Sequence, residues 1–183
     1  METIIQWELS LLHAIQEGAT EWGNVLWSAV TMIGEAGIFW IVTALVLMIF
    51  PKTRKMGFTM GLALLLGVIL GNGVMKNVFA RPRPYDLDPT LSHRLQWVEM
   101  SHDFSFPSGH TLACFEGATS VFLYHRKWGL AALTLAFTVM LSRLFLLVHY
   151  PTDLLAGALL GSLFAFLASL LVKYLWKRFA KAA

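Results

Sequence analysis

Long apolar stretches separated by short polar segments dominate the chain. A helix that crosses a bilayer needs about 20 mostly apolar residues. Four stretches meet this requirement, the second only when its flanks are included: 56–79, 110–124, 128–148 and 154–175. A fifth stretch, 37–50, needs residues 33–36 or local bilayer thinning to span. The pattern predicts an all-α, polytopic membrane helix bundle with five core transmembrane helices, and six spans as the alternative.

The first 34 residues have a different pattern. Within residues 2–16, apolar side chains recur at helical spacing while Glu8 lies elsewhere, which predicts an amphipathic helix in the membrane interface. Residues 22–34 form another apolar stretch, too short to span alone and therefore expected to be interfacial or re-entrant. The predicted division is an N-terminal unit, 1–34, and a membrane core, 35–183, with an outer loop at 81–107.

Composition supports the membrane assignment. Of the 183 residues, 57% are hydrophobic and 14% charged, against roughly 25% charged in soluble domains. The mean hydropathy is +0.63. These values exclude a disordered chain, a coiled coil and a disulfide scaffold, and the single cysteine, Cys114, cannot form an intramolecular disulfide. The net charge of +3 is attributed to loops that set topology, so no nucleic-acid partner is expected.

Basic residues predict the orientation. Three clusters fall on one side of a five-span arrangement: Lys52, Arg54 and Lys55; Arg126 and Lys127; Lys173, Lys177, Arg178 and Lys181. The positive-inside rule makes that side cytoplasmic, together with the C-terminus. The remaining basic residues lie on the outer side, against the rule, and so need another role: Lys76, Arg81, Arg83, Arg94 and Arg143.

The first polar group at the outer side contains Lys76 and Arg83. We expect a helix to continue between them, because seven residues then place both side chains on one face, about 10 Å apart. Pro82 and Pro84 end that helix. Asn72, four residues before Lys76, faces the same way.

The second group opens the third span with Pro107, Ser108, Gly109 and His110. Ser108 is expected to cap the helix. Gly109 and His110 then present free backbone N–H groups, which bind phosphate well at a helix N-terminus. Gly109 lets an anion approach the backbone, and His110 stands beside it as a proton donor.

The third group contains Ser142, Arg143, His149 and Asp153. Arg143 lies near the end of the fourth span, and His149 lies in the following link. Pro151 suits a helix start, which places Asp153 in the first turn of the fifth span. A carboxylate there can accept a hydrogen bond from one imidazole nitrogen and leave the other as a nucleophile. Phosphoryl transfer needs groups that stabilise charge, a nucleophile and an acid, and cations, a helix N-terminus and two histidines can supply them.

The three groups, in this order and spacing, resemble the signature blocks of the type 2 phosphatidic acid phosphatase superfamily. The resemblance implies that His149 attacks phosphorus to form a phosphohistidine, with Asp153 orienting it and His110 protonating the leaving group. It implies that the phosphate oxygens are held by Lys76, Arg83, Ser108, Gly109 and Arg143. It also implies that no metal or other cofactor is needed.

The expected function is therefore an integral-membrane lipid phosphatase, with a membrane lipid phosphate as its partner. An isoprenyl (undecaprenyl) diphosphate is favoured because Arg81 and Arg94 add outer cations that can contact a headgroup. Phosphatidic acid or phosphatidylglycerol phosphate is the alternative. A transporter or channel, the rival class, predicts charges spread through the membrane depth.

One ionisable residue lies deep in the third span. Glu116 is about 9 Å from His110 along the helix and is rotated away from its face. We expect a neutral carboxyl hydrogen-bonded to another helix.

Overall fold

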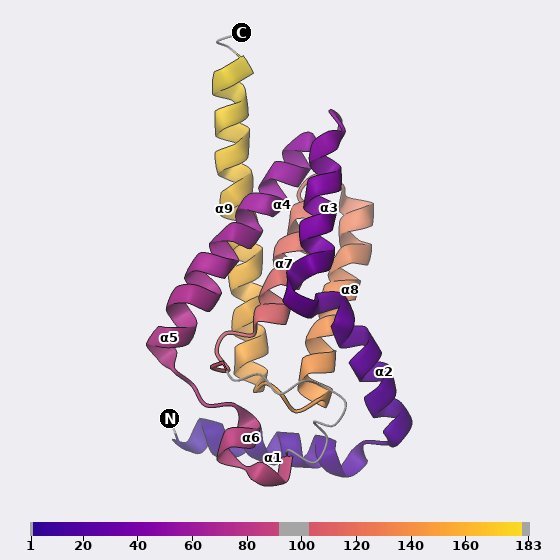
Figure 1. The fold of residues 1–183 in the computed structure, drawn as a ribbon, viewed down its shortest axis with the longest axis vertical. Coiled ribbons are helices and arrows are strands. Elements are labelled where there is room, and N and C mark those ends of the chain that lie inside the picture. Colours follow the sequence, from indigo (N-terminus) through magenta and orange to yellow (C-terminus); the bar gives the residue numbers. More distant parts are fainter. Residues whose placement is uncertain (1, 92–102, 181–183) are drawn as a thin grey trace.

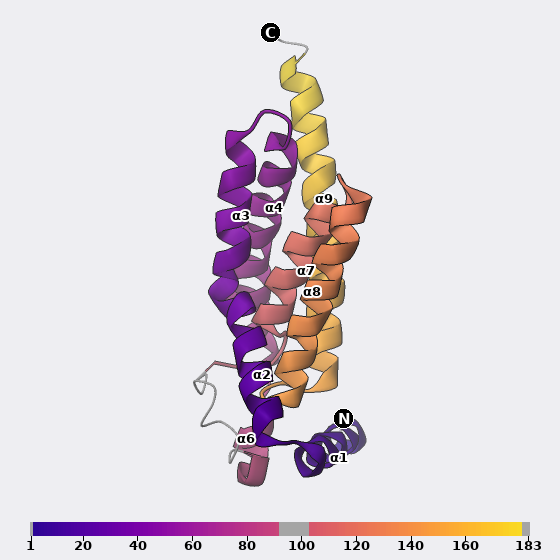
Figure 2. The same ribbon diagram turned by 90° about the vertical axis from the view of Figure 1, so that its right-hand side faces the viewer.

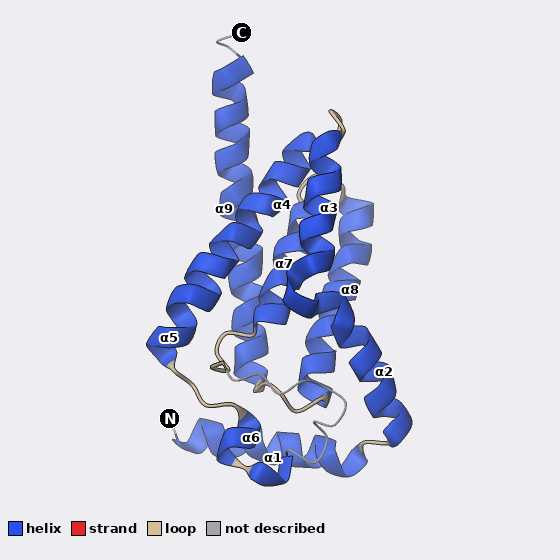
Figure 3. Cartoon of the chain, viewed as in Figure 1, coloured by secondary structure: helices blue, strands red, loops and turns tan. Residues whose placement is uncertain are grey.

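The computed structural model describes residues 2–91 and 103–180, and all regular secondary structure in these two ranges is helical (Figure 3). The elements in chain order are α1 (Glu2–Gly18), α2 (Glu21–Thr31), η1 (Met32–Gly37), α3 (Ile38–Ile49), α4 (Arg54–Leu66), η2 (Gly67–Met75), α5 (Lys76–Phe79), α6 (Pro84–Leu87), α7 (Gly109–Phe122), α8 (Arg126–Phe145) and α9 (Pro151–Ala180). η1 is a 3₁₀ helix and η2 a π-helical stretch. The predicted all-α membrane bundle is confirmed.

The long helices run along a common direction around α7 (Figures 1 and 2). α7 packs against α8 and α9, and α4 packs against α3 and α9. Four segments are long and apolar enough to cross a membrane: Glu21–Ile49, Arg54–Leu87, Arg126–Phe145 and Pro151–Arg178. The 14 residues of α7 are fewer than a span needs alone, and seven of them are buried at the centre of the bundle.

The first long segment contains three consecutive helical elements. α2, η1 and α3 follow one another end to end, so the boundary drawn after Gly34 falls inside one segment of span length. A kink interrupts it, because Ala36 and Gly37 adopt left-handed backbone conformations with φ of 48° and 67°. A side chain at Gly34 would lie 2.8 Å from Val139, so glycine allows this kink to pack against α8.

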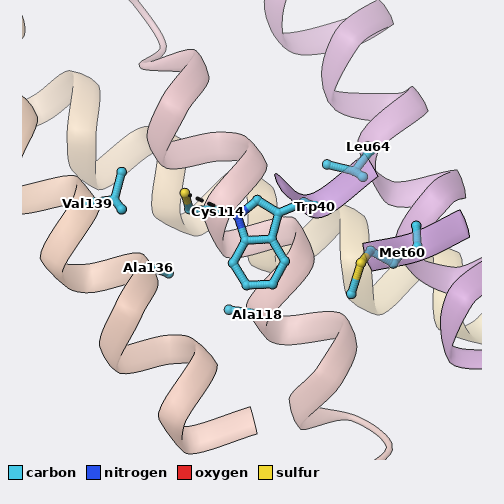
Figure 4. Packing of buried hydrophobic residues seen from close by; sticks show 8 residues of the cluster. Trp40, Met60, Leu64, Cys114, Ala118, Ala136 and Val139 are labelled. Carbon is cyan, nitrogen blue, oxygen red and sulfur yellow. Dashed lines mark hydrogen bonds between the residues drawn. The ribbon is translucent and has the colours of Figure 1, made fainter. Parts of the chain in front are cut away.

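A hydrophobic core joins α3, α4, α7 and α8 (Figure 4). Trp40 of α3 points across α7, and its indole Nε1 donates a 3.3 Å hydrogen bond to the Sγ of Cys114. Gly117 makes room for the same ring, since a Cβ there would lie 2.1 Å from it. The only cysteine of the chain is therefore a packed core residue.

The two ends of the bundle differ in chemistry. The α3–α4 turn, the α7–α8 turn and the C-terminal end of α9 share one end (Figure 1). The basic clusters at 52–55, 126–127 and 173–178 are therefore on the same end, as predicted; Lys181 lies outside the described residues. α1 crosses the opposite end, where α6 and the starts of α7 and α9 also lie.

Candidate active site

A cavity of about 420 Å³ opens between the kink at η1, the π-helical stretch η2 and the start of α7. Six of the predicted site residues line it: Lys76, Arg83, Gly109, His110, Arg143 and His149. They come from five separate parts of the chain. The fold therefore brings the three predicted groups together at one end of the bundle.

The route from Lys76 to Arg83 is not the predicted continuous helix. α5 ends at Phe79, and Ala80 takes a left-handed conformation with φ of 43°. Arg81 and Arg83 each precede a proline, which disfavours helical backbone at both positions. An extended segment therefore leads to Arg83, which lies buried at the start of α6.

Asp103, which is not among the residues predicted from the sequence, connects these two cations. Its Oδ2 accepts a hydrogen bond from Lys76 Nζ, and its Oδ1 accepts one from Arg83 Nη2. Partial burial alone would raise the pKa of Asp103, but hydrogen bonds and charges from Lys76 and Arg83 outweigh it and lower the pKa to about 2. The carboxylate of Asp103 is thus paired with two of the cations that are predicted to hold phosphate.

The N-terminus of α7 lies beside these groups. Ser108 stands at the N-cap position with extended backbone, but its side chain makes no capping hydrogen bond, contrary to prediction. Its hydroxyl instead accepts a hydrogen bond from Thr111 Oγ1 at 3.1 Å. Gly109 packs against Asn72, because a Cβ at Gly109 would lie 3.1 Å from the Asn72 Oδ1.

Arg143 approaches the cavity from the last turn of α8, as predicted. Its side chain is 2% exposed, and its Nη1 donates a 2.8 Å hydrogen bond to Thr31 Oγ1 at the end of α2. Its Nε has no hydrogen-bond partner among the described residues. A buried guanidinium with an unused donor can accept an additional anion.

His149 is buried, with its Nδ1 edge facing Ser105 and Asp153 and its Nε2 edge facing Arg83. Its Nδ1 lies 3.3 Å from Ser105 Oγ and 3.5 Å from Asp153 Oδ2. Ser105 donates its own hydroxyl proton to Asp153 Oδ2. Asp153 therefore orients the imidazole largely through Ser105, a residue that the sequence analysis did not identify.

The opposite ring nitrogen, Nε2, lies 3.4 Å from Arg83 Nη1. Burial and the positive charges of Arg83, Arg143 and Lys76 lower the pKa of His149 well below its usual value of 6.5. The imidazole is therefore neutral at pH 7. With its Nδ1 proton directed to Ser105, Nε2 carries the lone pair, which accepts the hydrogen bond from Arg83 Nη1.

His110 lies in the first turn of α7 and lines the cavity. Its Nε2 is 3.3 Å from Glu35 Oε2, on the kink between α2 and α3. The contact of Glu35 has no local signal in the sequence, because its approach depends on the left-handed backbone at Ala36. The contact supplies an acceptor that can hold a proton on His110.

Arg81 and Arg94 are the two residues predicted to contact a lipid headgroup. Arg94 lies outside the described residues. Arg81 is not among the described residues that line the cavity; its guanidinium pairs with Glu8 and Asp153 instead.

Glu116 lines the cavity and packs against Gly67. Its Oε1 is buried and has no hydrogen-bond partner in the described part of the chain. The predicted hydrogen bond to another helix is therefore wrong. Gly67 leaves so little room that a Cβ there would lie 2.2 Å from this oxygen.

The described residues contain no group of three or more His, Cys, Asp or Glu side chains that could hold a metal ion. The cavity instead gathers three buried cations around a neutral histidine. Such an arrangement can bind a phosphate group and present a nucleophile to it.

Fold and site define a multi-pass membrane protein with a cluster of buried cations around a cavity at one end of its helix bundle. The model of the PAP2 superfamily matches residues 53–177, and the chain belongs to that superfamily. This confirms the resemblance found in the three motif groups.

Two relatives carry more specific names. The undecaprenyl-diphosphatase of Sulfolobus acidocaldarius is 37% identical over 131 residues, which is 70% of this chain and 61% of that protein. The bacitracin transport permease protein BcrC of Bacillus licheniformis is 39% identical over 114 residues, 62% of this chain and 54% of that protein. The matched regions thus span somewhat more than half of each relative.

Two solved structures share the fold. The PAP2-type phosphatidylglycerolphosphate phosphatase of Bacillus subtilis superposes with a TM-score of 0.77 at 23% identity, covering 95% of this chain and 88% of that one. LpxE of Aquifex aeolicus superposes with a TM-score of 0.73 at 26% identity, covering 87% and 93%. At 23% identity, the likeness to the Bacillus subtilis structure shows a shared fold alone.

Proposed function

We propose that this protein is an integral-membrane lipid phosphatase that uses His149 as its nucleophile. The observation that carries the proposal is the position of the buried His149 imidazole between two sets of partners. Its Nδ1 is held by Ser105 and Asp153, while its Nε2 lies beside Arg83 at the cavity. Such a nucleophile needs no general base to remove a proton before it attacks.

The reaction has two displacement steps. In the first, His149 Nε2 forms a bond to phosphorus, the bond from phosphorus to the leaving oxygen breaks, and His110 donates a proton to that oxygen. In the second, His110 takes a proton from water, the water oxygen bonds to phosphorus, and the N–P bond breaks to release phosphate. Lys76, Arg83, Arg143 and the N–H groups at the start of α7 stabilise the charge on the phosphate oxygens.

The proposed substrate is an isoprenyl diphosphate of the undecaprenyl type. The name of the Sulfolobus relative supports it, as does the apolar side of the cavity, formed by Ile41, Leu64, Val68, Leu112 and Ala113. Attack on the terminal phosphorus then releases a lipid monophosphate as the leaving group. The buried cations would bind the terminal phosphate while the lipid chain remains on the apolar side.

Phosphate release from purified protein tests the activity and the substrate together. The panel contains undecaprenyl diphosphate, phosphatidic acid and phosphatidylglycerol phosphate in detergent, with His149→Ala as the blank. We expect the highest kcat/KM for the diphosphate. A higher kcat/KM for either glycerolipid would overturn the proposed substrate. If no phosphate is released from any of the three lipids, the proposed phosphatase activity is overturned.

We further propose that the site faces the extracytoplasmic side, with the C-terminus in the cytoplasm. The basic clusters at the opposite end of the bundle support this by the positive-inside rule. Ser92→Cys in a Cys114→Ala background should react with a membrane-impermeant thiol reagent in intact cells. If the cysteine is labelled only after lysis, the site faces the cytoplasm and the proposed orientation is wrong.

A further inference from the structure

Arg81 is the centre of a buried polar network next to the proposed active site. Its Nη1 donates hydrogen bonds to Asp153 Oδ1 and, at 2.7 Å, to Thr152 Oγ1. Its guanidinium carbon lies 3.9 Å from the centre of the Tyr150 ring. Arg81 therefore contacts three of the four residues that follow His149.

The backbone of Arg81 adds a second connection. Its carbonyl accepts a 2.8 Å hydrogen bond from the N–H of Ser105. Ser105 is the residue whose hydroxyl lies between His149 and Asp153. Both groups that hold the Nδ1 edge of His149 are thus attached to Arg81.

The N-terminal helix α1 completes this network through Glu8. The Glu8 side chain is fully buried although it comes from an otherwise amphipathic helix. Its Oε2 accepts a hydrogen bond from Arg81 Nη2, and its Oε1 accepts from the N–H and hydroxyl of Thr152 at 2.9 and 2.7 Å. Glu8 thus fixes Arg81 and the first turn of α9 at the same time.

We propose that Arg81 is a positioning residue for Asp153, and that α1 completes the active site by holding Arg81 through Glu8. Arg81 fixes the Oδ1 of Asp153, which leaves Oδ2 directed at Ser105 and His149. A carboxylate without this partner could rotate and lose its contact with Ser105. Arg81 acts through Asp153 and does not bind the substrate. This inference rests on the proposed phosphatase function.

The first test separates positioning from substrate binding. Arg81→Gln should lower kcat by about 10- to 100-fold, because small displacements of a reacting group have effects of this size. KM and the inhibition constant of inorganic phosphate should stay near their wild-type values. Glu8→Gln should lower kcat in the same direction by a smaller factor, and Arg81→Lys should recover part of the loss. Glu17→Gln, an exposed carboxylate on the same helix, is the matched control and should behave as wild type.

The second test is a double-mutant cycle with Asp153→Asn. If Arg81 acts through Asp153, Arg81→Gln should have little further effect on kcat once Asp153 is replaced. A merely structural role predicts that the two losses multiply. If Arg81→Gln fails to fold, the same cycle is run with Glu8→Gln, which keeps the arginine.

The outcomes are distinguishable from failure of the proposed function. Active wild-type protein in which Arg81→Gln raises KM or weakens phosphate inhibition would overturn this inference and make Arg81 a headgroup ligand. Multiplicative losses in the cycle would overturn it as well. Wild-type protein without turnover on any lipid phosphate would overturn the function first, and the positioning role with it.

Discussion

Asp103 pairs with Lys76 inside the cavity that is proposed to bind phosphate, and its second oxygen pairs with Arg83. A carboxylate there competes with the substrate for two cations. Asp103→Asn should therefore strengthen competitive inhibition by inorganic phosphate by about 10-fold, equivalent to about 1.4 kcal/mol. Asp88→Asn, at the same end of the bundle but outside the cavity, should leave the inhibition constant unchanged. Weaker inhibition in Asp103→Asn would mean that Asp103 is needed to position the cations.

The two histidines should differ in their response to the leaving group. His149→Ala should form no phosphoenzyme and show essentially no turnover. His110→Ala should slow the first step by about 10²- to 10⁴-fold, the usual contribution of a general acid. A substrate with a good leaving group needs little protonation and should recover much of that loss in His110→Ala alone. Rapid quench without acid, using labelled substrate, measures the phosphohistidine. If it is trapped in His149→Ala but not in His110→Ala, then His110 is the nucleophile and His149 the general acid.

The lowered pKa of His149 predicts a pH-dependent stability. The folded state keeps the imidazole neutral, while the unfolded chain binds a proton below the usual pKa of 6.5. Stability from this group is therefore fully present above pH 6.5 and is lost as the pH falls, by at most about 1.4 kcal/mol per pH unit. Thermal unfolding in detergent at pH 7.5 and 5.5 should show a larger drop for wild type than for His149→Gln. Equal drops would mean that the folded protein protonates His149.

Turnover should not depend on a metal ion. Lys76, Arg83 and Arg143 already supply the positive charge that a divalent cation would bring to a phosphate. Activity after treatment with EDTA and gel filtration should equal that of untreated protein. Loss of activity that Mg²⁺ restores would contradict the proposed charge stabilisation.

Gly67 should be required for the packing of Glu116. A methyl group at Gly67 would collide with the carboxyl, and overpacking of this kind typically costs about 1–3 kcal/mol. Gly67→Ala should lower the melting temperature, and adding Glu116→Ala should restore most of it. Gly73→Ala, where a Cβ would make only ordinary contact, is the control from the same π-helical stretch. Additive effects of the two substitutions would show that the residues do not touch.

Much of the proposed site could be predicted from the sequence because its motifs are local. Ser142, Arg143, His149 and Asp153 lie within twelve residues, and the end of one helix and the start of the next bring them to one end of the bundle. The apolar lengths likewise predicted the bundle, since membrane-spanning helices must satisfy their backbone hydrogen bonds internally. Local rules were less reliable at the helix ends. The chain leaves the helix after Phe79, and Ser108 does not cap α7 through its side chain.

The sequence by itself determined the membrane-bundle class and the histidines and cations of the candidate site, because periodicity, helix length and motif spacing are properties of neighbouring residues. Only the tertiary structure decided which side chains meet those groups. Asp103 and Glu35 reach the cavity, and Glu8 reaches Arg81 from 73 residues away. The position of Glu35 depends on a kink at Ala36, and that of Glu8 depends on how α1 crosses the end of the bundle. Neither has a local signature, because the free energy of a long-range ion pair depends on where the fold places both partners.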